Sequence, residues 1–211
     1  MKLIALIVFF CIAGYFFLFH MLGDSTLNGS QYKYFVPEKY INKKNLSIFG
    51  HPVNTEENAT STHLLVPSQK LSLEEDKQLS LIIFSQESGD ELINTNSKIF
   101  QNKKNKFNFE GEHFVYRKSV GGSEVIEYWN TNPAIFKNAN LENFYFVKVH
   151  KAKEIRVGDK VIKPKDTCDL YSWHDGLSLQ LGLLGENCSN NKMYSQVILD
   201  LKELISSWAI K

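Results

Sequence analysis

The sequence lacks the motifs by which many enzyme classes are recognised. It contains no glycine-rich loop with GxGxxG or Walker spacing, no GxSxG nucleophile elbow and no HExxH zinc motif. The adjacent glycines Gly121 and Gly122 lie between two strand-like segments, where they predict a turn and not a phosphate cradle. These absences argue against nucleotide binding and zinc proteolysis, and we expect no cofactor.

An excess of charge of one sign is also absent. The 211 residues include 24 basic and 23 acidic side chains, for a formal net charge of +1. Nucleic-acid binding depends on Lys and Arg that neutralise phosphates, and usually gives the domain a clear basic excess. We therefore expect no nucleic-acid partner.

Cysteine is scarce, and its placement is informative. Of the three cysteines, Cys11 lies in an apolar run, which leaves Cys168 and Cys188 as a pair in the rest of the chain. Neither belongs to a CxxC motif, and His174 is the only histidine between them, so we expect no metal site. Two free thiols remain an alternative. We predict a disulfide in an oxidising compartment, because closing a loop of this length stabilises a fold by about 3 kcal/mol.

The longest apolar run, Leu3 to Leu22, contains no charged side chain. A helix of this length spans about 30 Å, the thickness of a bilayer core. The alternatives are a cleaved secretory signal, a lipoprotein signal that uses Cys11, and a buried helix of a soluble domain. The apolar part of a signal is usually about 7–15 residues long, and Gly23-Asp24-Ser25 is a poor cleavage site. We predict a retained transmembrane anchor over residues 1–23.

The basic residues on the two flanks predict the orientation of this anchor. Lys2 precedes the apolar run, and no base follows it until Lys33. Because Lys and Arg are retained on the cytoplasmic side, the rest of the chain is expected outside the cytoplasm, in a periplasmic or extracellular position.

Beyond the anchor the sequence predicts two regions. Residues 24–67 are polar, with prolines and short apolar islands, and are interpreted as a stalk or linker that wraps onto the domain in places. Residues 68–211 are predicted to form one exterior α+β domain, built on a mainly antiparallel sheet and closed by a C-terminal amphipathic helix.

Patterns of alternation and turn residues predict the strands of this domain. Residues 79–84 alternate as in a strand, although Ser72 and Glu75 form a capping box that favours the start of a helix. Gly121-Gly122 predicts a two-residue hairpin turn. The strands expected after residue 84 are 113–120, 123–129, 144–150, 155–157, 160–162 and 177–183, the last with one leucine-rich face.

Two segments read as helices. Ser88 and Glu91 form a second capping box before apolar residues at helical spacing, which predicts a short helix up to about Phe100. Near the C-terminus an apolar stripe recurs at three- and four-residue intervals and is interpreted as packing on the core, with partner binding as the alternative. Its members are Val197, Ile198, Leu201, Leu204, Ile205 and Trp208.

Trp173, His174 and Asp175 form the most enzyme-like cluster, and we treat them as a weak candidate surface site. Ser172, just before them, completes a set of nucleophile, base and orienting carboxylate. Such groups must converge in space, and consecutive residues of a strand or turn point in different directions, which argues against a triad built from these neighbours alone. A turn that carries an exposed histidine is the simpler interpretation.

His113 and His150 each lie in a predicted strand and could approach one another across the sheet. With Glu110, Glu112 or Asp166 they would form a metal or acid–base site, whereas two half-buried sheet histidines are the simpler interpretation.

The expected function follows mainly from the missing motifs and the balanced charge. We expect a single-pass, membrane-anchored envelope protein that acts as a non-enzymatic accessory, assembly or protective factor by binding another envelope protein. An envelope hydrolase that uses His174 or Asp175 with residues from elsewhere is one alternative, and a pocket holding His174 beside another titratable group would favour it. A secreted ligand-binding module is the other.

Overall fold

The computed structural model describes residues 26–41, 61–73, 77–84, 107–131 and 141–210. The predicted anchor and the helix predicted after Ser88 lie outside these residues, as does the segment 42–60 of the predicted stalk. Over the ranges described, no helix is long and apolar enough to span a membrane.

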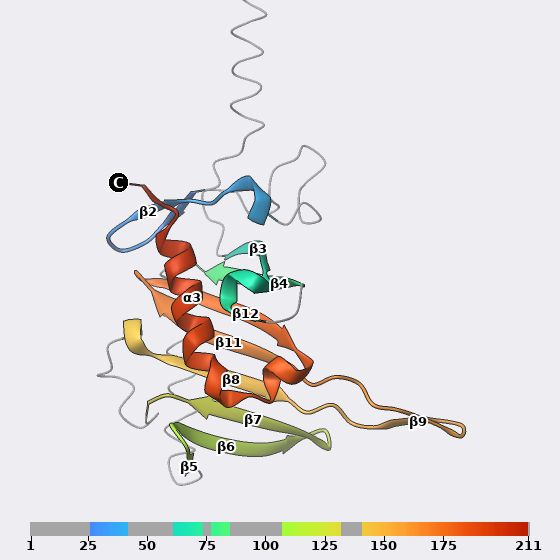
Figure 1. Ribbon diagram of the computed structural model, residues 1–211. Helices are drawn as coiled ribbons and strands as arrows, with labels where there is room; N and C mark the ends of the chain where they lie inside the picture. The colour runs from blue at the N-terminus through green and yellow to red at the C-terminus, as the bar shows by residue number, and fades with distance from the viewer. Residues whose placement is uncertain (1–25, 42–60, 74–76, 85–106, 132–140, 211) are drawn as a thin grey trace, which may run out of the picture.

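The main sheet has eight strands in the spatial order β3-β4-β12-β11-β8-β7-β6-β5 (Figure 1). Every pair of neighbouring strands is antiparallel. This confirms the predicted mainly antiparallel sheet. The strands are β3 (Ser61–Pro67), β4 (Gln78–Phe84), β5 (Asn108–Glu110), β6 (His113–Val120), β7 (Ser123–Trp129), β8 (Tyr145–His150), β11 (Thr167–His174) and β12 (Leu177–Leu184).

Smaller elements surround this sheet. Strands β1 (Thr26–Asn28), β2 (Lys33–Phe35) and β13 (Ala209–Ile210) form a three-stranded sheet, and β9 (Ile155–Val157) pairs with β10 (Lys160–Ile162). The α-helix α3 (Tyr194–Ser206) precedes β13. Five 3-10 turns complete the described elements: η1 (Glu38–Tyr40), η3 (Ser68–Leu71), η5 (Leu141–Asn143), η6 (Gly185–Cys188) and η7 (Asn191–Met193).

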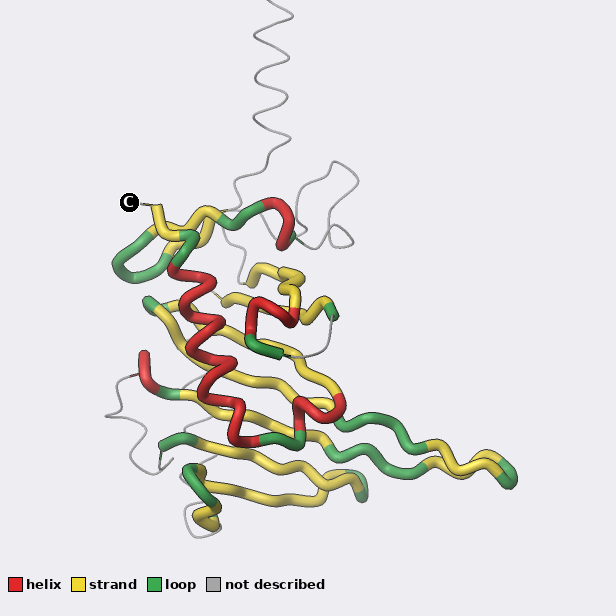
Figure 2. Tube along the Cα trace, in the orientation of Figure 1, coloured by secondary structure: helices red, strands yellow, loops and turns green. Residues whose placement is uncertain are grey.

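The core lies between α3 and one face of the sheet (Figure 2). Side chains of a strand alternate between the two faces, and the alternate leucines of β12, from Leu177 to Leu183, are all buried in this core. The predicted stripe of α3 packs on them, with Val197, Leu201 and Ile205 each no more than 1% exposed. Both the one-sided leucine strand and the C-terminal helix are therefore confirmed.

The opposite face of the sheet carries a smaller aromatic cluster. Trp129, Phe144, Phe146 and Trp173 are all buried there. The Trp129 and Phe146 rings stack with centroids 4.2 Å apart, and Phe146 stacks on Tyr171 at 4.4 Å. The sheet is thus apolar on both faces, with the helix covering the aliphatic one.

Several hairpin turns contain residues in the left-handed region. Gly121 and Gly122, with φ of 57° and 74°, connect β6 to β7 as predicted. The strands predicted at 155–157 and 160–162 are confirmed as well, and pair across a Gly158-Asp159 turn. Asp175 and Gly176, with φ of 49° and 77°, form a third turn, between β12 and the unpredicted β11. An Asp-Gly pair between two apolar segments is a recognised hairpin signal and could have revealed β11.

The boundary predicted at residue 68 does not match the sheet. Strand β3 falls inside the predicted stalk, yet its seven residues pair with β4 from Ser61 to Pro67. Tyr34, Val36 and Tyr40 of the same region are buried in the core. The apolar segments of the predicted stalk that the structure describes are therefore parts of the folded domain, because their side chains are buried in the core.

The segment around Ser72 ends a helical turn instead of starting one. Ser72 follows η3 and has a left-handed backbone with φ of 52°, and β4 begins at Gln78. The capping-box interpretation is therefore wrong at Ser72, and the alternation that predicted a strand over 79–84 is confirmed.

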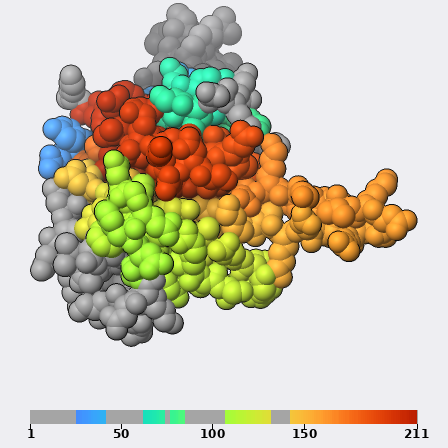
Figure 3. Space-filling view, turned by 60° about the horizontal axis from the view of Figure 1, so that its bottom comes forward, coloured from blue at the N-terminus to red at the C-terminus, as the bar shows by residue number. Residues whose placement is uncertain are grey.

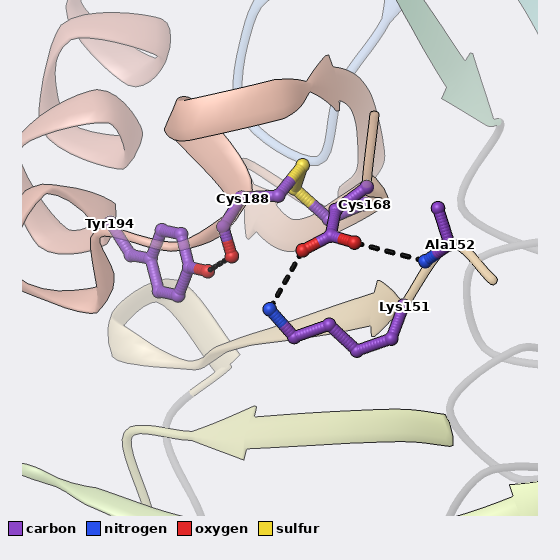
Figure 4. Close-up of a disulfide and its surroundings, with 6 residues drawn as sticks. Lys151, Ala152, Cys168, Cys188 and Tyr194 are labelled. Atoms are coloured by element: carbon purple, nitrogen blue, oxygen red, sulfur yellow. Dashed lines mark hydrogen bonds and ion pairs between the residues drawn. A yellow bond between two sulfur atoms is a disulfide. The ribbon is translucent and has the colours of Figure 1, made fainter. Parts of the chain in front are cut away.

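Cys168 and Cys188 form the predicted disulfide, with their Cα atoms 5.6 Å apart (Figure 4). Both cysteines are buried, and the hydroxyl of Tyr194 donates a hydrogen bond of 2.9 Å to the carbonyl oxygen of Cys188. The bond thus links the start of β11 to η6 beside the start of α3. It is consistent with an oxidising compartment outside the cytoplasm.

Candidate functional site

The Asp175-Gly176 turn fastens the N-terminal part of the domain to the sheet. The Asp175 carboxylate accepts hydrogen bonds from the backbone N–H groups of Gln31 at 2.7 Å and Tyr32 at 2.9 Å, and from the Tyr34 hydroxyl at 2.9 Å. Burial, and then the hydrogen bond to Asp175, raise the pKa of Tyr34. All these donors face a carboxylate that is only 8% exposed, so the role of Asp175 is structural.

His174 lies between a carboxylate and a hydroxyl from two other elements. Its Nδ1 is 3.3 Å from Oε2 of Glu142 in η5, and its Nε2 is 2.8 Å from Oγ of Ser206 at the end of α3. An ionised carboxylate only accepts hydrogen bonds, so Nδ1 carries the proton. In a neutral ring Nε2 is then an acceptor for the Ser206 hydroxyl, which is the tautomer of a general base.

Two further contacts position Glu142. Its Oε1 accepts a hydrogen bond from the backbone N–H of Asp175, and its carbonyl oxygen accepts one from Nζ of Lys202. Burial lowers the pKa of Lys202, and the charge of Glu142 opposes this effect. The Asp175-Gly176 turn therefore orients the Glu142 carboxylate, and the partly buried ammonium group of Lys202 binds the backbone of Glu142.

A groove of about 330 Å³ lies next to Glu142, between η5 and α3. Tyr145, Ile198 and Leu199 supply most of its apolar wall. Glu142, Asn143, Ser195 and Lys202 supply the polar groups. An apolar groove with a few converging polar groups is the usual form of a small-molecule site.

The chain matches no family model, no curated protein and no solved structure. We therefore argue function from the residues of this chain.

Of the three sequence-predicted site residues, only His174 contributes its side chain to this arrangement. Trp173, its neighbour in β11, belongs to the aromatic cluster on the opposite face, because side chains alternate along a strand. Asp175 contributes its backbone N–H, while its carboxylate holds the N-terminal segment. Sequence reasoning missed Glu142 and Ser206, which each lie 32 residues from His174 and carry no local signal.

The metal or acid–base site that His113 and His150 could have formed across the sheet does not form. Phe114 of β6 pairs with Trp129 of β7, which pairs with Phe146 of β8. His113 therefore lies opposite Tyr145, and His150 is at the other end of β8. Tyr145 and His150 also point to opposite faces, since they are five positions apart in the strand and side chains alternate. Among the residues described, no group of three potential ligands from His, Cys, Asp and Glu could hold a metal ion, and this covers Glu110, Glu112 and Asp166.

His113 is instead a buried histidine of the core. It is 3% exposed, its Nε2 lies 2.9 Å from the Tyr145 hydroxyl, and its ring packs edge-on against Tyr128 and Tyr194. Burial lowers the pKa of His113, and the charge of Glu112 opposes the shift.

We expect this burial to make stability depend on pH. Below pH ~6.5 an unfolded histidine takes up a proton that folded His113 binds less readily, so the free energy of unfolding falls as the pH is lowered from 7 to 5. In His113→Gln that fall should be smaller. Urea unfolding at the two pH values measures it, with His150→Gln as the control for removing a histidine. Equal slopes for the wild type and His113→Gln would contradict the prediction.

A second candidate site is the hairpin that contains β9 and β10. We call residues 151–166, which connect β8 to β11, the arm. The arm projects away from the body of the domain (Figures 1 and 3). All six residues of its two strands are exposed, and they include Ile155 at 51%, Val157 at 60% and Ile162 at 49%.

The register of the arm gathers these apolar side chains on one face. Ile155 pairs with Ile162, and Val157 pairs with Lys160, so all four point to the same side. Two ion pairs brace the arm near its base, at 2.8 Å between Lys163 and Glu154 and at 2.7 Å between Lys151 and Asp166. The arm is therefore a two-stranded hairpin with two ion pairs and an exposed apolar face.

Proposed function

We propose that the protein is a membrane-anchored envelope protein whose exterior domain acts as an accessory, assembly or protective factor by binding another protein. Leu3 to Leu22 would anchor it, since their length and lack of charge suit a bilayer. The disulfide supports a position outside the cytoplasm. The observation that carries the binding role is the arm.

The apolar face of the arm supports a binding role, because its exposure to water is unfavourable in free energy and a partner would bury it. Fully burying a Val or Ile side chain is worth about 1.5–3 kcal/mol, and Ile155, Val157 and Ile162 are each about half exposed or more. A two-stranded hairpin has little stability of its own in water. Contact with a partner would bury this face and support both strands.

A protein suits the arm better than a lipid bilayer does. Within the described chain β9 and β10 pair only with each other, so each has one outer edge of backbone N–H and C=O groups. Burying such an edge in hydrocarbon costs several kcal/mol per unsatisfied group, whereas a strand of a partner would pair with it.

Charge points to an acidic partner surface. The arm contains six basic residues (Lys151, Lys153, Arg156, Lys160, Lys163, Lys165) and three acidic ones (Glu154, Asp159, Asp166), in a chain with a net charge of only +1. We therefore propose a partner protein that offers an apolar strand edge or groove with an acidic rim.

Site-specific photo-cross-linking in intact membranes tests this proposal. A photoreactive residue at Val157 should give one discrete protein adduct, and the same residue at Ile210, which is 48% exposed on β13, should not. Adding Ile155→Ser and Ile162→Ser should reduce the adduct at least 10-fold without changing the melting temperature, because the arm lies outside the core. The chain should also stay with the membranes after an alkaline wash.

Three results would contradict the binding role. They are adducts with lipid alone, equal adducts at Val157 and Ile210, or an adduct unaffected by the two serine substitutions. Release of the full-length chain by the alkaline wash would contradict the anchor and leave the arm proposal standing.

A further inference from the structure

Three side chains at the end of α3 are arranged as nucleophile, base and orienting carboxylate. The Ser206 hydroxyl lies 2.8 Å from Nε2 of His174, and Nδ1 of the same ring lies 3.3 Å from Glu142. Serine hydrolases of unrelated folds share this constellation, which is recognised by geometry and not by order in the sequence. Here the three groups come from α3, β11 and η5, so packing of the whole domain assembles them.

The surroundings restrain the base and leave the nucleophile accessible. The His174 side chain is 20% exposed, and its ring lies 6.3 Å from that of Tyr34. Asp175, which donates its N–H to Glu142, is itself held by three hydrogen bonds. Ser206 is exposed at the last position of α3. A substrate could therefore reach the hydroxyl without displacing the core.

We propose that Ser206, His174 and Glu142 form a catalytic site that hydrolyses esters of short-chain carboxylic acids. This activity is independent of protein binding through the arm. Ser195, Leu199, Lys202 and Ser206 follow one another at intervals of three and four residues and so share one face of α3. The groove of about 330 Å³ runs along that face and ends at Lys202, which lies four residues, or ~6 Å along the helix axis, from Ser206. An acyl chain of a few carbons on Ser206 would extend towards this Lys202 end of the groove.

The groups present can carry both steps of an ester hydrolysis. Oγ of Ser206 attacks the carbonyl carbon while Nε2 of His174 takes the hydroxyl proton. The ester C–O bond then breaks, and the alcohol leaves with the proton from His174. Water attacks the acyl-serine with His174 again as base, which releases the acid and restores the Ser206 hydroxyl. Glu142 stabilises the transient imidazolium, and the ammonium of Lys202 supplies positive charge in the groove.

A fluorophosphonate probe, which reacts with activated serines, tests the site in the detergent-solubilised full chain. Mass spectrometry should locate the label on Ser206 of the wild type. Ser206→Ala and His174→Asn should each lower both labelling and hydrolysis of p-nitrophenyl butyrate at least 100-fold, in line with the 10²–10⁴-fold contribution of a general base. The matched control is Ser207→Ala, since Ser207 is an exposed neighbour whose hydroxyl donates to the carbonyl oxygen of Leu204 at 2.6 Å.

A purely structural role gives a different pattern. If the three groups only fasten α3 to the sheet, Ser206→Ala lowers the melting temperature while the wild type is neither labelled at Ser206 nor active. That result overturns the proposal, as does equal labelling of Ser206 and Ser207. The arm variant with Ile155→Ser and Ile162→Ser should keep full esterase activity, so failure of this proposal and failure of the binding role are distinguishable.

Discussion

Asp175→Ala should lower the free energy of unfolding by about 3 kcal/mol. The substitution removes the acceptor for two backbone N–H groups and for the Tyr34 hydroxyl, and Tyr34 is only 1% exposed. Each donor left unsatisfied in a buried position costs about 1–3 kcal/mol, less where water can replace the acceptor. Alanine is also disfavoured at the left-handed φ of 49°, which aspartate tolerates better.

Urea unfolding with two comparison variants separates these causes. Asp175→Asn keeps one acceptor oxygen and the tolerance for left-handed backbone, so it should lose about half as much stability. Asp169→Ala, in the preceding strand β11, removes only a half-buried carboxylate that Gln180 contacts at 3.2 Å, and should cost less than about 1 kcal/mol. If Asp175→Ala and Asp169→Ala unfold alike, Asp175 does not anchor the N-terminal segment.

The same contact can be broken from its other side. A Cβ added at Gly29 would collide with the Asp175 carboxylate and lie 2.9 Å from the Asp175 carbonyl oxygen, so Gly29→Ala must displace the Asp175 side chain, its backbone or both. Hydrogen exchange should then show lost protection over β1 and β2 in both Gly29→Ala and Asp175→Ala. Protection lost throughout the sheet would show that the contact supports the whole fold and not only this segment.

Removing the disulfide should have an effect of similar size. The double variant Cys168→Ala, Cys188→Ala should lose about 3 kcal/mol on the chain-entropy model for a separation of 20 residues. The loss should concentrate at η6 and the start of α3, because the bonded Cys188 also accepts the hydrogen bond from Tyr194.

Denaturant unfolding with and without reductant measures this contribution. Reductant should destabilise the wild type and leave the double variant unchanged, while Cys11→Ala serves as the control for loss of the third cysteine. Titration of two free thiols at Cys168 and Cys188 in the unfolded, non-reduced protein would refute the bond. It would also remove the main support for an oxidising compartment.

The arm and the Ser206 site occupy separate regions of the domain. The arm connects β8 to β11 at the Cys168 end, whereas His174 lies at the opposite end of β11, beside the last turn of α3. A variant of one region can therefore be measured without disturbing the other. For this reason binding and hydrolysis can be tested independently in the same protein.

Local patterns in the sequence were sufficient for the elements whose signal is contained in a few neighbouring residues. The Gly121-Gly122 turn, the alternating leucines of β12 and the apolar stripe of α3 are examples, since positive φ and the periods of two and 3.6 residues are local properties. The pairing of Cys168 with Cys188 could also be predicted, because no other cysteine follows Cys11.

Tertiary structure decided everything that depends on residues far apart in the chain. The short apolar segments around Tyr34 and Leu64 were predicted to belong to a stalk. They are buried in the core, but the sheet that buries them is formed by later residues, so the local sequence does not reveal it. Trp173, His174 and Asp175 are adjacent in sequence, but their side chains lie in three different places. Trp173 is in the aromatic cluster, His174 contacts Ser206 in the candidate active site, and Asp175 binds the N-terminal segment. Glu142 and Ser206 reach His174 only because η5 and α3 pack against the end of β11, and no local pattern encodes such a contact.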